Sequence, residues 1–293
     1  MQGISVLIVT HNRAHLIEET IKSVLSQTYK HFEILVIDDG STDNTEEIVS
    51  SINDSRIVYH KYARIGRLTT LRNIAVNKSR FQFVAFVDSD DLWIPEKLEK
   101  CLLVCNSSPC DICIADCIEF NSSGNTGNSR GYLLNSQPQV NIGKEILENN
   151  IPLTYGSNLF FRKEIYTSGL KFDEDLFVGD HDFMMRSAYK FRAVYIPEVL
   201  TRVRKHEKNM TLDNKMHLIP ILEFNRTLLK LKSEKLISEN LYKKSLAKNY
   251  YSIASHYQHL KLTKRSIKNL AQSLKYDFNL KTLFHYSKKI LGK

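Results

Sequence analysis

Short apolar runs of strand length alternate with amphipathic stretches over roughly the first 120 residues. Apolar side chains recur at helical spacing over residues 16–25, 68–75 and 98–105, and the third of these helices begins just after Pro95. Short apolar runs joined by helices are typical of a mostly parallel sheet covered on both faces, so the pattern predicts an α/β fold. The predicted strands cover residues 4–10, 33–38, 56–61, 82–88 and 111–119.

The pattern changes twice along the rest of the chain. Residues 121–143 are rich in Asn, Ser and Gly, which predicts a loop or hairpin outside the core. Regular structure then returns, with a helix predicted over 180–191 and strands over 193–196 and 199–204. After Thr211 the chain becomes Lys-rich with apolar residues at helical spacing, so we expect a boundary there and a helical extension beyond it.

Charge is distributed unevenly between these two regions. Residues 212–293 hold 17 Lys and Arg against 5 Asp and Glu, whereas the residues before them hold 24 against 27. The formal net charge of +9 therefore belongs to the C-terminal region. Apolar residues make up 42% and charged residues 25% of the chain, an ordinary globular composition that excludes a disordered protein.

The sequence favours a cytoplasmic protein. No apolar run approaches the roughly 18 residues that a membrane-spanning helix needs, and the N-terminus leads directly into the first apolar strand without a basic leader. The five cysteines, clustered between Cys101 and Cys117, are an odd number and do not predict a disulfide framework. Cys110 and Cys113 have a zinc-like gap, but no second ligand pair accompanies them, so we expect buried thiols.

Two common phosphate-binding loops are missing from the sequence. A dinucleotide-binding fold would carry G-x-G-x-x-G after its first strand, but the chain has Thr10-His11-Asn12-Arg13 there. The P-loop pattern G-x-x-x-x-G-K-[ST] is also missing. A bound nucleotide must therefore be held by side chains and a metal ion.

Acidic residues follow two of the predicted strands. The second strand ends in Asp38 and Asp39, and the fourth leads into Asp-Ser-Asp-Asp at residues 88–91. In a parallel sheet both clusters reach the same edge, where ligands bind. A D-x-D triplet offers carboxylates to a hard divalent cation that can also bridge a diphosphate. The alternative is that these residues form turns and cap helices.

With these clusters in place, the sequence resembles the inverting family-2 glycosyltransferases with the GT-A fold, over about residues 3–211. The resemblance implies a Rossmann-like sheet with a nucleotide-sugar half over about 1–120 and an acceptor half over about 121–211, before a basic helical region over 212–293. It rests on SVLIVTHNR at 5–13, SVLSQT at 23–28, FEILVIDDGSTD at 32–43, LRN at 71–73, DSDDLWIPEKL at 88–98, FDE at 172–174 and GDHDF at 179–183.

The resemblance implies roles for residues on the nucleotide side. Thr10, Asn12 and Asp39 match positions that hold the base and ribose of a nucleotide sugar, with Asp39 accepting from N3 of uracil. Arg67 matches a position that contacts the nucleotide in some relatives, and the alternative is a solvated charge that opens a helix. Arg72 is expected only to pack beneath the site.

The resemblance also implies a metal site. Asp88 is expected to reach the ribose, and Asp90 to ligate Mn²⁺ or Mg²⁺ between the two phosphates. Such a cation neutralises charge on the leaving nucleoside diphosphate. His206 resembles the histidine that completes the metal or diphosphate site in the family, the alternative being an exposed side chain. Asp91 is expected to cap a helix or support the site.

The match to the family's catalytic base is Asp180. A base takes the proton from the acceptor hydroxyl as that hydroxyl attacks the anomeric carbon. The sequence departs from the family here, because Gly179 stands where the family has Glu and His181 where it has an aromatic residue. The alternatives are that Asp180 only caps its helix or that Asp182 is the base.

Together these matches predict a metal-dependent inverting glycosyltransferase that moves a sugar from a nucleotide sugar, UDP-linked, to a saccharide hydroxyl. A lipid-linked saccharide in cell-surface polysaccharide or glycolipid synthesis is the expected acceptor. The basic C-terminal region then either contacts the inner face of the membrane or packs on the catalytic domain as a helical bundle. No nucleic-acid-binding module is recognised.

Two rival functions remain open from the sequence. A sugar-phosphate nucleotidyltransferase uses a related sheet, but it would carry a Gly-rich basic loop after the first strand, which Thr10 to Asn12 do not provide. A non-catalytic relative that only binds nucleotide sugar is kept open by the altered Gly179 beside Asp180.

Overall fold

The structure is a computed structural model that describes residues 2–107, 109–129, 139–140, 142–148, 156–207, 209, 214–278, 282–284 and 287–288. It divides into two compact units, one of residues 1–146 with 151–206 and one of residues 147–150 with 207–293. The boundary predicted near Thr211 falls outside the described residues.

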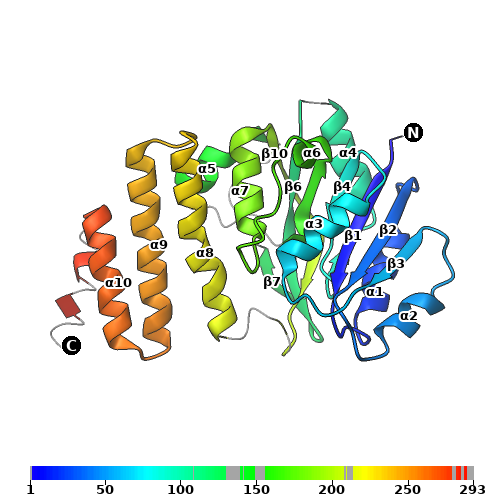
Figure 1. Ribbon diagram of the computed structural model, residues 1–293, viewed down its shortest axis with the longest axis horizontal. Coiled ribbons are helices and arrows are strands. Elements are labelled where there is room, and N and C mark those ends of the chain that lie inside the picture. Colours follow the sequence, from blue (N-terminus) through cyan, green and yellow to red (C-terminus); the bar gives the residue numbers. More distant parts are fainter. Residues whose placement is uncertain are drawn as a thin grey trace. The chain divides into compact units, whose positions relative to one another are not determined.

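The first unit is built on a single mixed sheet (Figure 1). Its first four strands run parallel as predicted, but β9 lies antiparallel to both β4 and β6, so the half beyond β4 is mixed. In sheet order the strands are β3 (Ile57–Lys61), β2 (Phe32–Asp38), β1 (Ile4–Thr10), β4 (Phe83–Phe86), β9 (Leu159–Arg162), β6 (Ile112–Asn121), β10 (Ala193–Arg204) and β5 (Leu92–Trp93).

Two short strands and a bulge mark where the structure differs in detail from the sequence pattern. β7 (Gly124–Ser129) pairs with β6 as a hairpin in the predicted loop region, and β8 (Gln139–Val140) pairs with β10. The two strands predicted over 193–204 form one strand, β10, whose register shifts on either side of Val199. Pro197 lies at this irregularity, and a proline cannot donate to the ladder.

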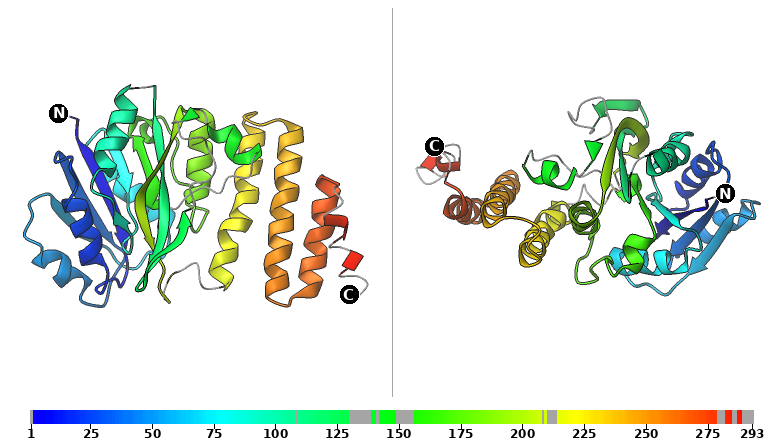
Figure 2. Two further views of the ribbon diagram at one scale, coloured as in Figure 1. Left: turned by 180° about the vertical axis from the view of Figure 1, so that it is seen from behind. Right: turned by 90° about the horizontal axis from the view of Figure 1, so that it is seen from above.

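Helices cover both faces of the sheet (Figure 2). α1 and α4 lie on one face, and α3 lies on the other against β1 and β2. The helices of this part of the chain are α1 (Ile17–Leu25), α2 (Thr45–Ser51), α3 (Leu68–Lys78), α4 (Lys97–Ser107), α5 (Ile142–Glu148), α6 (Glu164–Thr167) and α7 (Asp180–Lys190), with a 3-10 turn, η1, over Gly156–Asn158.

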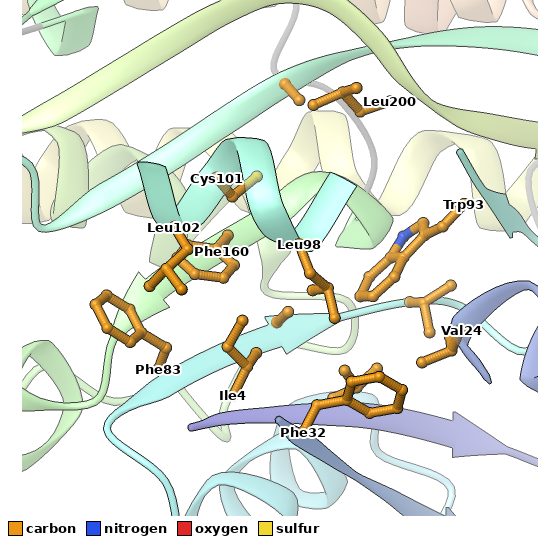
Figure 3. Packing of buried hydrophobic residues seen from close by; sticks show 14 of the residues in the cluster. Ile4, Val24, Phe32, Phe83, Trp93, Leu98, Cys101, Leu102, Phe160 and Leu200 are labelled. Atoms are coloured by element: carbon orange, nitrogen blue, oxygen red, sulfur yellow. The ribbon is translucent and has the colours of Figure 1, made fainter. Parts of the chain in front are cut away.

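The core between the sheet and the helices α1 and α4 follows from strand alternation. Ile4, Val6 and Ile8 of β1 face this core, because successive side chains point to opposite faces of a strand. Figure 3 shows Phe83 of β4 beside Leu102 of α4, with Ile4 of β1 close by and Leu98 of α4 beside Trp93. All five cysteines are free and buried, with Cys101 and Cys105 on α4 and the others at or in β6.

The parallel strands end together at one rim of the sheet. Thr10 at the end of β1 pairs in register with Asp38 at the end of β2. Beyond β4 the chain continues beside β1, where Val87 N donates to Leu7 O at 3.1 Å. The residues that follow the three strands, including Asp39 and Asp88, therefore emerge at the same edge, as the parallel pattern predicted.

The second unit contains three long helices, α8 (Asn214–Ser233), α9 (Glu239–His259) and α10 (Thr263–Tyr276). The hydroxyl of Ser238 caps α9 by accepting from Leu241 N at 3.1 Å. Asn249 of α9 donates to Ile221 O of α8 at 2.7 Å, so a hydrogen bond joins these helices. Within the described ranges no helix combines the length and the apolar character needed to cross a membrane.

Candidate active site

The end of β1 is tied to the turn after β2 by Asn12. Its backbone N donates to Ser41 Oγ at 2.8 Å, and its Oδ1 accepts from Thr42 N at 2.8 Å. Asn12 adopts a positive φ of 51°, a conformation that Asn tolerates better than most residues. Thr10 is 2% exposed, and in the described part of the chain its Oγ1 has no hydrogen-bond partner. The predicted nucleotide residues Thr10 and Asn12 thus lie together at the rim.

Asp39 lies beside them but already has several hydrogen-bond donors. Its carboxylate forms an ion pair with Arg64 and accepts from Ile65 N at 2.6 Å and Gly66 N at 3.0 Å. Gly40, at φ 72°, lies in the turn after β2 and close to the loop after β3. A side chain would not fit at this position, since a Cβ there would lie 2.9 Å from Arg64 N. Asp39 therefore anchors the loop after β3, and a nucleobase would share the carboxylate with that loop.

The loop after β4 is held from beneath by Asp91. This carboxylate is 2% exposed and accepts from the Ser157 hydroxyl and, at 2.9 Å, from Arg204 N. Burial and the like charges of Asp90 and Asp88 raise the pKa of Asp91 well above the usual range for a carboxyl group. Asp91 thus supports the loop, as expected from the sequence.

Asp90 and His206 come together although they are far apart in the chain. Asp90 Oδ2 lies 3.1 Å from His206 Nε2, and Arg204 Nε donates to the backbone O of Asp90 at 2.9 Å. Both side chains are largely buried, at 16% and 18% exposure. Among the residues that the structure describes, no cluster of three or more His, Cys, Asp or Glu side chains is arranged to hold a metal ion.

Arg72 joins the loop after β4 to the first residue of α7. Its guanidinium, 2% exposed, forms an ion pair with Asp180 and lies 3.5 Å from Asp88 Oδ1. Burial lowers the pKa of Arg72 to about 10, against the opposing effect of the Asp88 charge, so the side chain remains a cation at neutral pH. Asp88 is the more open carboxylate of the two, with 39% of its side chain exposed against 14% for Asp180.

The sequence predicts only a packing role for Arg72, and the bridge to Asp180 and Asp88 is a difference that the structure shows. A signal was available, since Arg72 follows Leu68 by four residues and precedes Ala75 by three, on the same face of α3. A cation on an apolar helix face must find a buried partner.

The structure gives a reason for the glycine at position 179. Gly179 precedes α7 with φ 67°, and a Cβ there would lie 2.3 Å from Thr69 Cγ2. The backbone and the neighbouring α3 therefore both exclude a Glu side chain in this arrangement.

Of the two acids at the start of α7, only Asp180 faces the site residues. Asp182 is 1% exposed and forms an ion pair with Arg186 on its own helix, with an N to O distance of 2.6 Å. A carboxylate held in this way lacks access to a substrate hydroxyl, which argues against Asp182 as the base.

Arg67 is directed at the segment before α7. Its guanidinium donates to Glu174 O at 2.6 Å, while Asn73 Nδ2 donates to Phe172 O at 2.9 Å and to Glu174 Oε1 at 2.8 Å. In this structure Arg67 helps α3 hold the segment that leads to Asp180.

Comparison with known proteins gives a match to one family model and to several curated relatives. A family model described as glycosyl transferase family 2 matches residues 5–169, more than half of the 293 residues. Over 100 residues the chain is 40% identical to the Escherichia coli protein UDP-Glc:alpha-D-GlcNAc-diphosphoundecaprenol beta-1,3-glucosyltransferase WfaP, covering 34% of this chain and 40% of that protein. It is 38% identical over 99 residues to the putative teichuronic acid biosynthesis glycosyltransferase TuaG of Bacillus subtilis, covering 33% and 39%. These matches span less than half the length of the curated relatives.

Solved structures share the fold over nearly the whole chain. Staphylococcus aureus TarS in complex with UDP-GlcNAc is similar with a TM-score of 0.70 at 20% identity, covering 94% of this chain and 81% of that one. The mannosyltransferase PcManGT from Pyrobaculum calidifontis, in complex with GDP-Man and Mn²⁺, is similar with a TM-score of 0.65 at 15% identity, covering 98% and 79%. At such identities the likeness shows the fold alone.

Proposed function

Since the chain belongs to glycosyltransferase family 2 and has the GT-A fold, we propose that it transfers a sugar from a nucleotide-sugar donor to a saccharide hydroxyl with inversion. The observation that carries this proposal is the arrangement of Asp88 on one side of Arg72 and Asp180 on the other. We assign this activity to residues 1–211, with donor contacts in the first half and acceptor contacts in the second.

Asp180 is the general base in this proposal. It accepts the proton of the acceptor hydroxyl while that oxygen bonds to the anomeric carbon, and the bond from this carbon to the nucleoside diphosphate breaks on the opposite side. A single carboxylate is sufficient for the proton transfer. Asp180 fits the role of base because its carboxylate, at the start of α7, is linked through Arg72 to the loop after β4. The carboxylate of Asp182 is instead buried against Arg186.

Asp90 and His206 are the residues that would hold Mn²⁺ or Mg²⁺. Their donor atoms lie only 3.1 Å apart, which suits a shared cation. Two protein donors are enough, because such cations commonly take their remaining ligands from water and substrate phosphates. When bound, the cation neutralises charge on the leaving diphosphate.

The donor and acceptor are inferred from chemistry and from the relatives. Thr10 has a buried hydroxyl with no partner in the described residues, which a nucleotide could satisfy beside Asn12 and Asp39. WfaP is named for a UDP-Glc donor and a diphosphoundecaprenol-linked sugar, and TarS was solved with UDP-GlcNAc. We therefore propose a UDP-sugar donor and a lipid-linked saccharide acceptor for the synthesis of a surface polysaccharide.

A lipid-linked acceptor makes peripheral membrane contact part of the proposal. The exposed side chains of α10 include Lys264, Arg265, Lys268 and Lys275, while its opposite side is buried. Phe278, just beyond the helix, is 66% exposed. Basic side chains on a helix, with an aromatic side chain just beyond it, suit an anionic lipid surface, with each cation contributing on the order of 1 kcal/mol.

The test is release of nucleoside diphosphate by the purified chain. With Mn²⁺ and a panel of UDP-, GDP- and dTDP-sugars, we expect slow donor hydrolysis that EDTA and Asp90→Ala abolish. Adding a lipid-linked saccharide should speed release, and Asp180→Asn should reduce that acceptor-dependent rate by roughly 100-fold or more. Glu47→Gln, which neutralises an exposed carboxylate on α2, is the matched control and should leave both rates unchanged.

Two results would contradict the proposal. One is the absence of turnover with every donor although the nucleotides bind, which would indicate a non-catalytic binding protein. The other is release of pyrophosphate from UTP and a sugar phosphate, which would indicate a nucleotidyltransferase.

A further inference from the structure

Arg72 occupies a closely fitted place between the donor side and the base side of the candidate active site. Its Nη1 forms an ion pair with Asp180 and donates to Val178 O at 3.1 Å, while Nη2 faces Asp88. The guanidinium carbon lies 5.7 and 5.8 Å from the ring centroids of Phe86 and Phe172. A planar cation surrounded in this way has little freedom to turn.

Gly156 in η1 leaves the space that this ion pair needs. A Cβ at that position would lie 2.9 Å from Arg72 Nη2 and 3.0 Å from Asp180 Oδ2. The neighbouring Ser157 accepts from Asp88 N at 2.9 Å and donates to Asp91, so η1 is fixed against the loop after β4. The distance between the base and this loop is thus set by buried contacts on several sides.

We propose that Arg72 is a positioning residue that holds the Asp180 carboxylate toward the donor site. This inference rests on the proposed function, in which Asp180 is the base. Asp180 begins α7, where an acidic side chain can turn back to the free backbone N–H groups of the first helical turn. The ion pair instead ties the carboxylate to Arg72, whose guanidinium also faces Asp88.

The same contact separates two carboxylates. Arg72 remains a cation at neutral pH, forms an ion pair with Asp180 and faces Asp88. A cation beside a carboxylate favours its ionised form, which is the form that accepts a proton.

The experiment compares four single variants in the full chain with Mn²⁺, the best UDP-sugar and an acceptor. Arg72→Met should lower kcat by roughly 100-fold, the scale of a small misplacement of a reacting group, with the donor KM changed less than about threefold. Arg72→Lys keeps the charge and should recover about tenfold of that loss. Lys78→Met removes an exposed charge from the same helix and should match the wild type.

Gly156→Ala provides a test that removes no charge and remains informative if Arg72→Met does not fold. Its added Cβ pushes Arg72 and Asp180 apart, so kcat should fall about tenfold or more while the donor KM is unchanged. Donor KM rising in step with the loss of kcat in these variants would overturn the inference, because Arg72 would then act in donor binding. Equal losses of kcat in Arg72→Lys and Arg72→Met would overturn it as well, because a second cation at this place should restore part of the positioning. Failure of the proposed function is distinct, since the wild type itself would then show no transfer.

Discussion

Gly179 offers a sharp test of how the site is built, because two separate effects exclude a side chain there. Its φ of 67° lies in the left-handed region, and an added Cβ would lie 2.3 Å from Thr69 Cγ2. Gly179→Ala should therefore destabilise the first unit through backbone strain and through overpacking against α3.

The expected magnitude follows from these two terms. The left-handed conformation costs a residue with a Cβ about 1–2 kcal/mol, and overpacking adds about 1–3 kcal/mol. Together they predict a loss of about 2–5 kcal/mol in the free energy of unfolding. Gly66 is the matched control, since its φ is 72° and an added Cβ would meet nothing within 4 Å. Gly66→Ala should therefore show the backbone term alone.

A double mutant separates the two terms. Thr69→Ser removes the methyl group that clashes and keeps the hydroxyl that donates to Leu176 O at 2.8 Å. Combined with Gly179→Ala it should restore about 1–3 kcal/mol, so the two substitutions should be non-additive. Thr69→Ser alone should cost about 1 kcal/mol for the lost buried methyl group.

The assay is guanidinium unfolding followed by fluorescence of Trp93. This residue is the single tryptophan of the chain, is 3% exposed and lies in the first unit, so it reports on the unit that carries the site. Equal losses in Gly179→Ala and Gly66→Ala would refute the steric argument. So would a double mutant no more stable than the two single effects predict by addition.

Two further predictions concern carboxylates that the structure pairs. Asp182→Asn should lower stability by about 3–5 kcal/mol, because it leaves the buried Arg186 without its charge partner; a stable, fully folded variant without transfer activity would instead make Asp182 the base. Asp54→Asn should lose up to about 1 kcal/mol at pH 7, because the hydrogen bond and charge of Arg56 lower the pKa of Asp54 to about 2. This stabilisation is present above the ordinary carboxyl pKa and is lost as the pH falls through about 2, so denaturant curves of wild type and variant should converge with falling pH.

The family and the GT-A fold predicted from the sequence are confirmed by the family model and by the solved structures. Both can be predicted from local pattern, because the spacing of apolar residues indicates which segments form strands and which form helices. The motif positions also follow from local pattern, since Asp88 to Asp91 leave a parallel strand at the edge where ligands bind. The roles of the individual site residues and the limits of the catalytic domain stay predictions.

Contacts between distant segments depended on the tertiary structure. The sequence predicts a packing role for Arg72, and its ion pair with Asp180 is apparent only once α3 lies against the start of α7. In the same way Gly179 is only a departure from the family in the sequence, and the structure explains it by the nearby Thr69. Likewise the sequence leaves Asp182 open as an alternative base to Asp180, and its burial against Arg186 argues against that alternative. The periodicity of a chain specifies which face of an element is buried, but the partner that a side chain meets is set by the register and packing of elements about 100 residues apart.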